Sequence, residues 1–356
     1  MSPIFEDVSG ICLVKLSSIG DVVHALPVAA ALRRKFPGAY IAWAVQPAAA
    51  DIVVGNPHLD ETLVVGGSGA TGPGVRHLPG LSSPQRLARA LRAHRFDLAL
   101  DMQGLLKSAW TSFLSGARHR IGYRRAGEGA FLLYTHRLVS NRADAHAVDI
   151  YLEFAKLLGA PTDPLDFTIA VSEEDRRAVD DLLGPGDNLV ALVPGARWLS
   201  KRWPAARFAE LADLLAEGFG CTIVLVGDAR DAPLSRQIGA LARTHVLDLT
   251  GRTTLKQLAE TLRRCHATIS NDTGPMHISA ALATPTVGIF GPTNPVRVRP
   301  YGEGHITVTP SVSCHPCRRR ECSPLKCMES ITTEEVFAAA RRLLERRRGG
   351  DSSAIE

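Results

Sequence analysis

The stretch Ile11-Cys12-Leu13-Val14-Lys15-Leu16-Ser17-Ser18-Ile19-Gly20-Asp21 shows how the chain begins to fold. Its first six residues form a short, mostly apolar run, which is typical of a buried parallel strand. A polar turn follows, and helical spacing then extends from Pro27 to Phe36, with Pro27 best suited to the first turn of a helix. A second strand over residues 39–45 completes a β-loop-α-β unit, which predicts a doubly wound sheet.

The alternation of strands and helices restarts in the second half of the chain. Proline-containing stretches flank an acidic helix, so we expect the joint between two domains within residues 162–187, with the boundary at 172/173. Further strands are predicted at 189–193, 222–226, 267–270 and 286–290. The fold class is therefore α/β, with two Rossmann-like domains facing each other across a cleft. A last helix over about 333–348 is expected to pack back on the N-terminal domain, and the Gly- and Pro-rich residues 66–80 are expected to form a flexible loop.

Composition limits the class of protein. The chain has 356 residues and a formal net charge of +5, which permits an anionic partner without requiring nucleic acid. No apolar run is long enough to span a membrane, and the N-terminus has no basic region typical of a secretory signal. We therefore expect a cytoplasmic protein. Arginines concentrate at 118–120 and 124–125, where the alternative to a binding site is a solvated surface.

Polar residues follow several predicted strands, at the positions where α/β sheets bind ligands. Asp21, after the first strand, is either a carboxylate for chemistry or an N-cap. Arg197 and Lys201, after the strand at 189–193, are either phosphate ligands or surface charges beside packed tryptophans. Residues 271–277 precede a helix whose N-terminus favours an anion, although Asp272 or Thr273 could instead simply cap it.

Taken together, these segments resemble the bacterial lipopolysaccharide heptosyltransferases of glycosyltransferase family 9. Residues 17–27 and 101–108 are similar to the first two signatures of that family. The remaining signatures are similar to three segments of the second half: residues 194–204, 271–277 and 290–293. The resemblance extends from about residue 11 to 345.

The resemblance implies the GT-B fold and an inverting transfer of heptose, without a catalytic metal, from ADP-L-glycero-D-manno-heptose to the inner core of lipopolysaccharide. It implies that Asp21 is the general base. The implied donor-binding residues are Gly195, Arg197, Lys201, Asp231, Asp272, Thr273, Gly274 and His277. The implied acceptor-binding residues are Ser18, Gly20, His24, Gln103, Lys107, Arg120 and Arg124. The chain departs from some relatives at Ala196-Arg197, where they have hydroxyl residues beside the phosphates.

The implied partners are ADP-heptose and a lipid A/Kdo-type acceptor, with no nucleic acid. The enzyme would be cytoplasmic and peripheral to the inner membrane, where the arginines at 118–120 and 124–125 would meet acidic groups of the acceptor and the inner leaflet. Two alternatives remain. One is a family 9 transferase with another donor or acceptor, and the other is a non-catalytic nucleotide-binding protein.

Four cysteines near the C-terminus have the spacing Cys-x2-Cys-x4-Cys-x4-Cys: Cys314, Cys317, Cys322 and Cys327. Thiolates this close in sequence suit a structural zinc or iron. Reduced thiols packing a loop, and disulfides, are the alternatives. No cofactor is expected to be required for catalysis.

Overall fold

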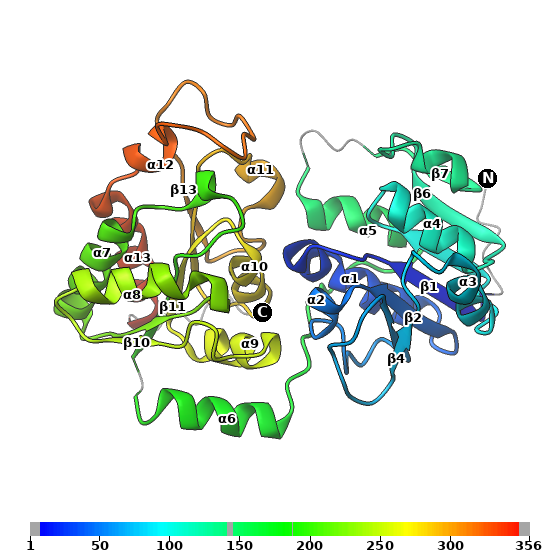
Figure 1. Cartoon of the computed structure of the whole chain (residues 1–356), viewed down its shortest axis with the longest axis horizontal. Coiled ribbons are helices and arrows are strands. Elements are labelled where there is room, and N and C mark those ends of the chain that lie inside the picture. Colours follow the sequence, from blue (N-terminus) through cyan, green and yellow to red (C-terminus); the bar gives the residue numbers. More distant parts are fainter. Residues whose placement is uncertain (1–7, 141–144, 187, 349–356) are drawn as a thin grey trace. The chain divides into compact units, whose positions relative to one another are not determined.

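The computed structural model describes residues 8–140, 145–186 and 188–348 (Figure 1). The chain forms two compact units that divide between Ala170 and Val171, two residues before the boundary expected from the sequence. Each unit contains one parallel sheet with helices.

The first unit is built on a seven-stranded sheet of order β4-β3-β2-β1-β5-β6-β7. Its strands are β1 Gly10–Val14, β2 Tyr40–Val45, β3 Glu61–Val65, β4 Val75–Leu78, β5 Leu98–Asp101, β6 His119–Tyr123 and β7 His136–Leu138. Its helices are α1 Ile19–Lys35, α2 Pro47–Ala50, α3 Pro84–Arg92, α4 Leu106–Leu114, the 3-10 helix η1 Ala130–Leu133 and α5 Ala147–Leu157.

Helix α1 begins eight residues earlier than the sequence predicted. The polar turn expected before Pro27 is the first part of the helix, which starts at Ile19 with Ser18 as its N-cap. Pro27 lies inside the helix, where it cannot donate a hydrogen bond to the preceding turn. Asp21 therefore stands in the first turn of α1 and not in a loop.

The prediction of a flexible loop over residues 66–80 is wrong in part. Val75–Leu78 forms β4, which pairs in parallel with β3 at the edge of the sheet. Two of its four residues are exposed, so the strand lacks the apolar run that predicts a buried strand.

The second unit contains a six-stranded sheet of order β10-β9-β8-β11-β12-β13. Its strands are β8 Leu189–Val193, β9 Thr222–Leu225, β10 Val246–Asp248, β11 Ala267–Asn271, β12 Thr286–Ile289 and β13 Ile306–Val308. Its helices are α6 Glu173–Leu183, η2 Leu199–Lys201, α7 Ala205–Phe219, η3 Ala229–Asp231, α8 Ala232–Leu241, α9 Leu255–Arg264, α10 Gly274–Ala281, α11 Pro295–Val298, α12 Lys326–Ser330 and α13 Thr333–Arg348.

Helix α13 packs on the second unit. It contacts α7 and strands β11 to β13, and its apolar side chains belong to the same core as Trp203 and Phe208. These contacts assign α13 to the second unit, and the expectation that the last helix also packs back on the N-terminal domain stays a prediction.

Both sheets reverse their strand order at one point. In the first unit β1 lies between β2 and β5, and in the second β8 lies between β9 and β11. Loops that leave the carboxyl ends of strands on either side of such a point diverge, which opens a crevice for a ligand. The polar segments after β1 and β5, and those after β8 and β11, occupy these two positions.

Candidate active site

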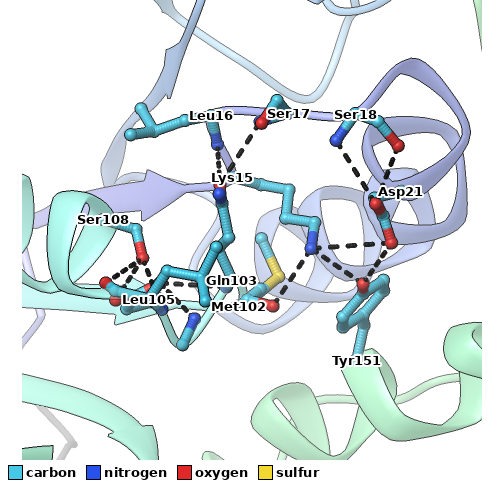
Figure 2. Close-up of polar contacts among 12 residues, drawn as sticks. Lys15, Leu16, Ser17, Ser18, Asp21, Met102, Gln103, Leu105, Ser108 and Tyr151 are labelled. Atoms are coloured by element: carbon cyan, nitrogen blue, oxygen red, sulfur yellow. Dashed lines mark hydrogen bonds and ion pairs between the residues drawn. The ribbon is translucent and has the colours of Figure 1, made fainter. Parts of the chain in front are cut away.

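Asp21 is held at the carboxyl end of β1 by a capping box. Its Oδ2 accepts hydrogen bonds from Ser18 Oγ at 2.8 Å and from the Ser18 backbone N–H at 3.3 Å (Figure 2). Its side chain is 39% exposed. Asp21 is therefore not the N-cap that the structural alternative expected: Ser18 is the N-cap, and one Asp21 carboxylate oxygen closes the capping box at the helix start.

The other oxygen of Asp21 faces two buried groups. Tyr151 of α5 donates its hydroxyl to Asp21 Oδ1 at 3.0 Å, and the Lys15 ammonium lies 3.8 Å from the same oxygen. Lys15 Nζ also donates to the Tyr151 hydroxyl at 2.8 Å. Figure 2 shows the three side chains converging from the residue after β1, from α1 and from α5. We refer to Lys15, Asp21 and Tyr151 as the carboxylate triad.

These contacts control the ionisation of Asp21. Burial alone would raise the pKa of its carboxyl, but the charge of Lys15 and the hydrogen bonds from Ser18 and Tyr151 outweigh burial, so the pKa lies below its ordinary value. Asp21 is therefore a carboxylate at neutral pH and can accept a proton without first losing one.

A second carboxylate, Asp101 at the end of β5, bonds the loop that lies beside the start of α1. It is fully buried and accepts hydrogen bonds from the Tyr134 and Ser108 hydroxyls at 2.6 and 2.9 Å. It also accepts the backbone N–H groups of Gln103 and Gly104. Burial raises the pKa of Asp101 despite these donors. The loop after β5 is thus tied to a fixed point in the core.

Gln103 links the loop after β5 to the loop after β1 by hydrogen bonds. Its Oε1 accepts the backbone N–H groups of Leu16 at 2.9 Å and Ser17 at 3.3 Å (Figure 2). Lys107 donates from Nζ to Ser17 Oγ at 3.2 Å and to Gln46 Oε1 at 3.3 Å. Gln103 and Lys107, both predicted acceptor ligands, therefore bond the loop between β1 and α1, and the Gln103 oxygen already accepts two backbone N–H groups.

The other predicted acceptor residues lie in different surroundings. Gly20 and His24 are buried in α1, and the His24 ring meets the His146 ring edge-on at 5.1 Å. Arg120 lies on β6, separated from β1 by β5, and its guanidinium donates to the backbone oxygens of Leu133 and Ala117. Arg124 follows β6 and is exposed. Of the predicted set, Ser18, Gln103 and Lys107 make the hydrogen bonds described above with Asp21 or with the loop between β1 and α1.

In the second unit, Asp272 contacts three polar side chains at the end of β11. Its Oδ2 accepts from Lys201 Nζ at 2.6 Å and from Thr293 Oγ1 at 2.7 Å, and its Oδ1 lies 3.8 Å from His277 Nε2. Asp272 is 6% exposed. The predicted donor residues Lys201, Asp272 and His277 are thus adjacent, and Asp272 orders two loops and a helix.

The start of α10 adjoins this group. Thr273 is the N-cap and its side chain makes no capping hydrogen bond, while Asp272 is engaged with Lys201 and Thr293. Simple capping by either residue therefore does not explain the segment. The first N–H groups of a helix have no intrahelical partner and carry partial positive charge, so Thr273 and Gly274 present a surface for an anion. Buried Asn271 ties this end of β11 to the Pro194 carbonyl.

Gly195 and Asp231 lie against each other at the end of β8. A Cβ at position 195 would stand 2.1 Å from Asp231 Oδ2, so a larger residue there would force the Asp231 carboxylate or the backbone to move. Burial and then the charge of Asp228 raise the pKa of Asp231, partly offset by Arg202, whose Nη2 is 3.3 Å away. Arg197 is exposed on the neighbouring loop.

The four clustered cysteines are free thiols. Cys327 is buried in the core, which raises its pKa, whereas Cys314 and Cys322 are exposed. Within residues 8–140, 145–186 and 188–348, no three His, Cys, Asp or Glu side chains are grouped as ligands for a metal ion. The arrangement of the thiols therefore gives no support to the predicted structural zinc or iron.

Two partners of Asp21 were missed from the sequence. Lys15 carried a signal, because a lysine within an apolar strand is rarely buried unless it is paired. Tyr151 carried none, since it reads as one more buried residue of an amphipathic helix, 130 positions along the chain from Asp21.

Comparison with known proteins extends these observations. A model of the family described as glycosyltransferase family 9 (heptosyltransferase) matches residues 85–328. Lipopolysaccharide heptosyltransferase 1 of Pseudomonas aeruginosa is 30% identical over 320 residues, covering 88% of this chain and 87% of the relative.

Two solved structures share the fold. The glycosyl transferase family 9 protein from Veillonella parvula matches with a TM-score of 0.81 at 24% identity, covering 96% of this chain and 98% of that chain. The E. coli heptosyltransferase WaaC, solved with ADP-2-deoxy-2-fluoro heptose, matches with a TM-score of 0.71 at 23% identity, covering 94% and 99%.

The predicted fold class, an α/β chain of the GT-B type with two Rossmann-like domains, is confirmed by the two sheets and by these likenesses. The chain belongs to glycosyltransferase family 9 (heptosyltransferase) and is a glycosyltransferase.

Proposed function

We propose that this enzyme transfers heptose from ADP-L-glycero-D-manno-heptose to the inner core of lipopolysaccharide, with inversion and without a catalytic metal. The observation that carries the proposal is the carboxylate triad. An ionised carboxylate, oriented through both oxygens and still 39% exposed, is what a general base for a sugar hydroxyl requires.

In the proposed reaction the N-terminal domain binds the acceptor and Asp21 takes its hydroxyl proton. The hydroxyl oxygen attacks the anomeric carbon of the heptose, and the bond from that carbon to the β-phosphate oxygen of ADP breaks. The proton ends on Asp21 and the electron pair leaves with ADP. Attack opposite the leaving group inverts the anomeric centre.

In the C-terminal domain, Lys201 is the residue best suited to the diphosphate. Its side chain is 17% exposed, and its ammonium already lies against an anion, the Asp272 carboxylate at 2.6 Å. Arg197 and the N–H groups at the start of α10 add positive potential beside it. Fixed positive charge of this kind stabilises a departing diphosphate, which is the task that a metal performs in other transferases.

The acceptor, a lipid A/Kdo-type lipopolysaccharide, would hold the enzyme at the inner leaflet from the cytoplasmic side. None of the helices among the described residues combines the length and apolar character that crossing a bilayer requires. Arg118, Arg124 and Arg125 are exposed and suit acidic groups of such an acceptor.

The donor is tested by incubating the enzyme with a heptose-deficient lipopolysaccharide and ADP-heptose, with GDP- and UDP-sugars in parallel. Transfer from ADP-heptose alone is the expected result. Transfer from another nucleotide sugar would replace the donor and leave the reaction class standing. Nucleotide binding with no transfer to any acceptor would favour a non-catalytic binding protein.

Asp21→Asn tests the base. We expect at least a hundredfold loss of kcat, since general bases contribute roughly 10²- to 10⁴-fold, with the Kd for ADP-heptose unchanged. Asp175→Asn is the matched control, because Asp175 closes an equivalent capping box with Ser172 at the start of α6. Equal activity of the two variants would reduce Asp21 to a helix cap.

A further inference from the structure

Exposed apolar side chains gather in one part of the first unit. Among the described residues, ten large hydrophobic side chains are exposed, and five of them lie between positions 106 and 139. They are Leu106, Trp110, Phe113, Leu132 and Val139. Leu132 and Val139 are each 71% exposed, which is the largest exposure among the ten. Clustered exposure of this kind marks a surface that meets a partner.

The elements that carry these residues are neighbours in the first unit. Leu106, Trp110 and Phe113 recur at the spacing of one helix face on α4, and the Trp110 and Phe113 rings stack at 5.5 Å. Arg120 lies 5.5 Å from the Phe113 ring and bonds the Leu133 carbonyl of η1, which brings η1 beside α4.

The edge strand β7 also belongs to this group of neighbouring elements. Leu138, the last residue of β7, accepts the backbone N–H of Arg124, so Val139 stands next to the arginines that follow β6. We call the five apolar residues and the exposed arginines among them the α4–β7 surface; these arginines are Arg118, Arg124, Arg125 and Arg137.

The charge of this part of the chain is strongly one-sided. Residues 106–139 contain six lysines and arginines and a single acid, Glu128, so their formal charge equals the +5 of the whole chain. The rest of the protein is therefore neutral in sum. A surface that combines exposed apolar side chains with concentrated positive charge matches an interface that is anionic outside and apolar beneath.

We propose that the α4–β7 surface docks the enzyme on an anionic lipid bilayer, with its apolar side chains at the level of the headgroups and its arginines on the lipid phosphates. Tryptophan suits that level, because its ring is apolar and its N–H is polar. A symmetric contact between two copies would bring like charges together, which disfavours self-association. Binding to nucleic acid would not explain why aliphatic side chains such as Leu132 and Val139 are exposed.

The surface begins next to the predicted acceptor loop. Lys107, one residue after Leu106, donates to Ser17 Oγ, and Ser17 immediately precedes Ser18, the N-cap of α1 that bonds Asp21. The inference deepens the proposed function, since it names the face by which a lipid-anchored acceptor would be approached. Vesicle binding needs neither donor nor acceptor, so the docking surface and the transfer reaction fail or succeed separately.

The test measures cosedimentation of the full chain with phosphatidylcholine vesicles that contain about one third of the anionic lipid phosphatidylglycerol. We expect binding that weakens with added salt and is absent with phosphatidylcholine alone. Leu132→Ser/Val139→Ser should lower the partition coefficient about tenfold or more, because two apolar side chains leave the interface. Arg137→Glu should lower it by a similar factor and flatten the salt dependence.

The matched control is Leu157→Ser/Leu241→Ser, which removes two leucines that are 42% and 51% exposed outside the surface. It should bind vesicles like the unaltered chain, and Leu132→Ser/Val139→Ser should keep full transfer to a deacylated, water-soluble acceptor. No sedimentation with anionic vesicles, or equal loss in both double variants, would overturn the proposal. Concentration-dependent dimers abolished by Leu132→Ser/Val139→Ser, or RNA binding without vesicle binding, would overturn it in favour of those partners.

Discussion

The Lys15 ammonium lies 3.8 Å from the Asp21 carboxylate, and its own side chain is 4% exposed. A buried cation so close to the proposed base keeps that base ionised, but it also weakens its affinity for a proton. In the proposed reaction Asp21 would therefore be ionised before the acceptor binds but would have a low affinity for the proton, so that the departure of ADP drives the proton transfer. The Tyr151 hydroxyl bonds to both groups and fixes their separation.

Lys15→Met should move the acid limb of the kcat–pH profile to higher pH. Because Lys15 lowers the pKa of Asp21, its removal raises that pKa, and a higher pH is then needed to form the carboxylate. The measurement is kcat across pH at saturating donor and acceptor. Lys35→Met, in the exposed last turn of α1, should leave the profile in place. An unmoved acid limb in Lys15→Met would mean that Asp21 does not govern the rate.

Tyr151→Phe should lower kcat about 10- to 100-fold with little change in the KM for ADP-heptose, since a hydrogen bond to a charged group is worth roughly 1.5–3 kcal/mol. The loss arises because Asp21 Oδ1 and Lys15 Nζ both lose a partner. A double-mutant cycle with Lys15→Met separates this role from general damage to the fold, because the two changes should be strongly non-additive. Simple additivity would place Tyr151 outside the carboxylate triad.

Lys201→Met should weaken ADP binding about 10- to 100-fold, the value of a hydrogen bond to a charged group. Isothermal titration with ADP gives the Kd directly, without an acceptor. Arg342→Met, on the exposed side of α13, controls for the general loss of a positive charge in the same unit. An unchanged Kd would mean that Lys201 stays with Asp272 when the nucleotide binds.

Gly195→Ala should lower the free energy of unfolding by about 1–3 kcal/mol, the usual cost of overpacking. The new Cβ would stand 2.1 Å from Asp231 Oδ2, so the end of β8 and Asp231 must move apart. Urea denaturation measures the loss, and ADP binding should weaken with it. Gly38→Ala is the control, because a Cβ there meets no atom within 4 Å. Equal stability of the two variants would contradict the tight packing of Gly195.

The sequence by itself determined the two α/β units and the positions along the chain of the functional residues that follow their strands. The apolar run from Ile11 to Leu16 and the strands at 189–193 and 267–271 are buried, and buried parallel strands are continuous apolar segments that can be recognised locally. Ligand-binding loops follow such strands at their carboxyl ends, so Asp21, Lys201 and Asp272 could be singled out in advance.

Tertiary structure alone decided what surrounds those residues. Lys15 and Tyr151 reach Asp21 from β1 and α5, and Asp272 joins Lys201 to Thr293, through contacts between positions far apart in the chain. Local periodicity carries no information about such pairs. It also misplaced the start of α1, because Pro27 disfavours a helix interior while packing against α5 and the capping box at Ser18 sustain the helix across it.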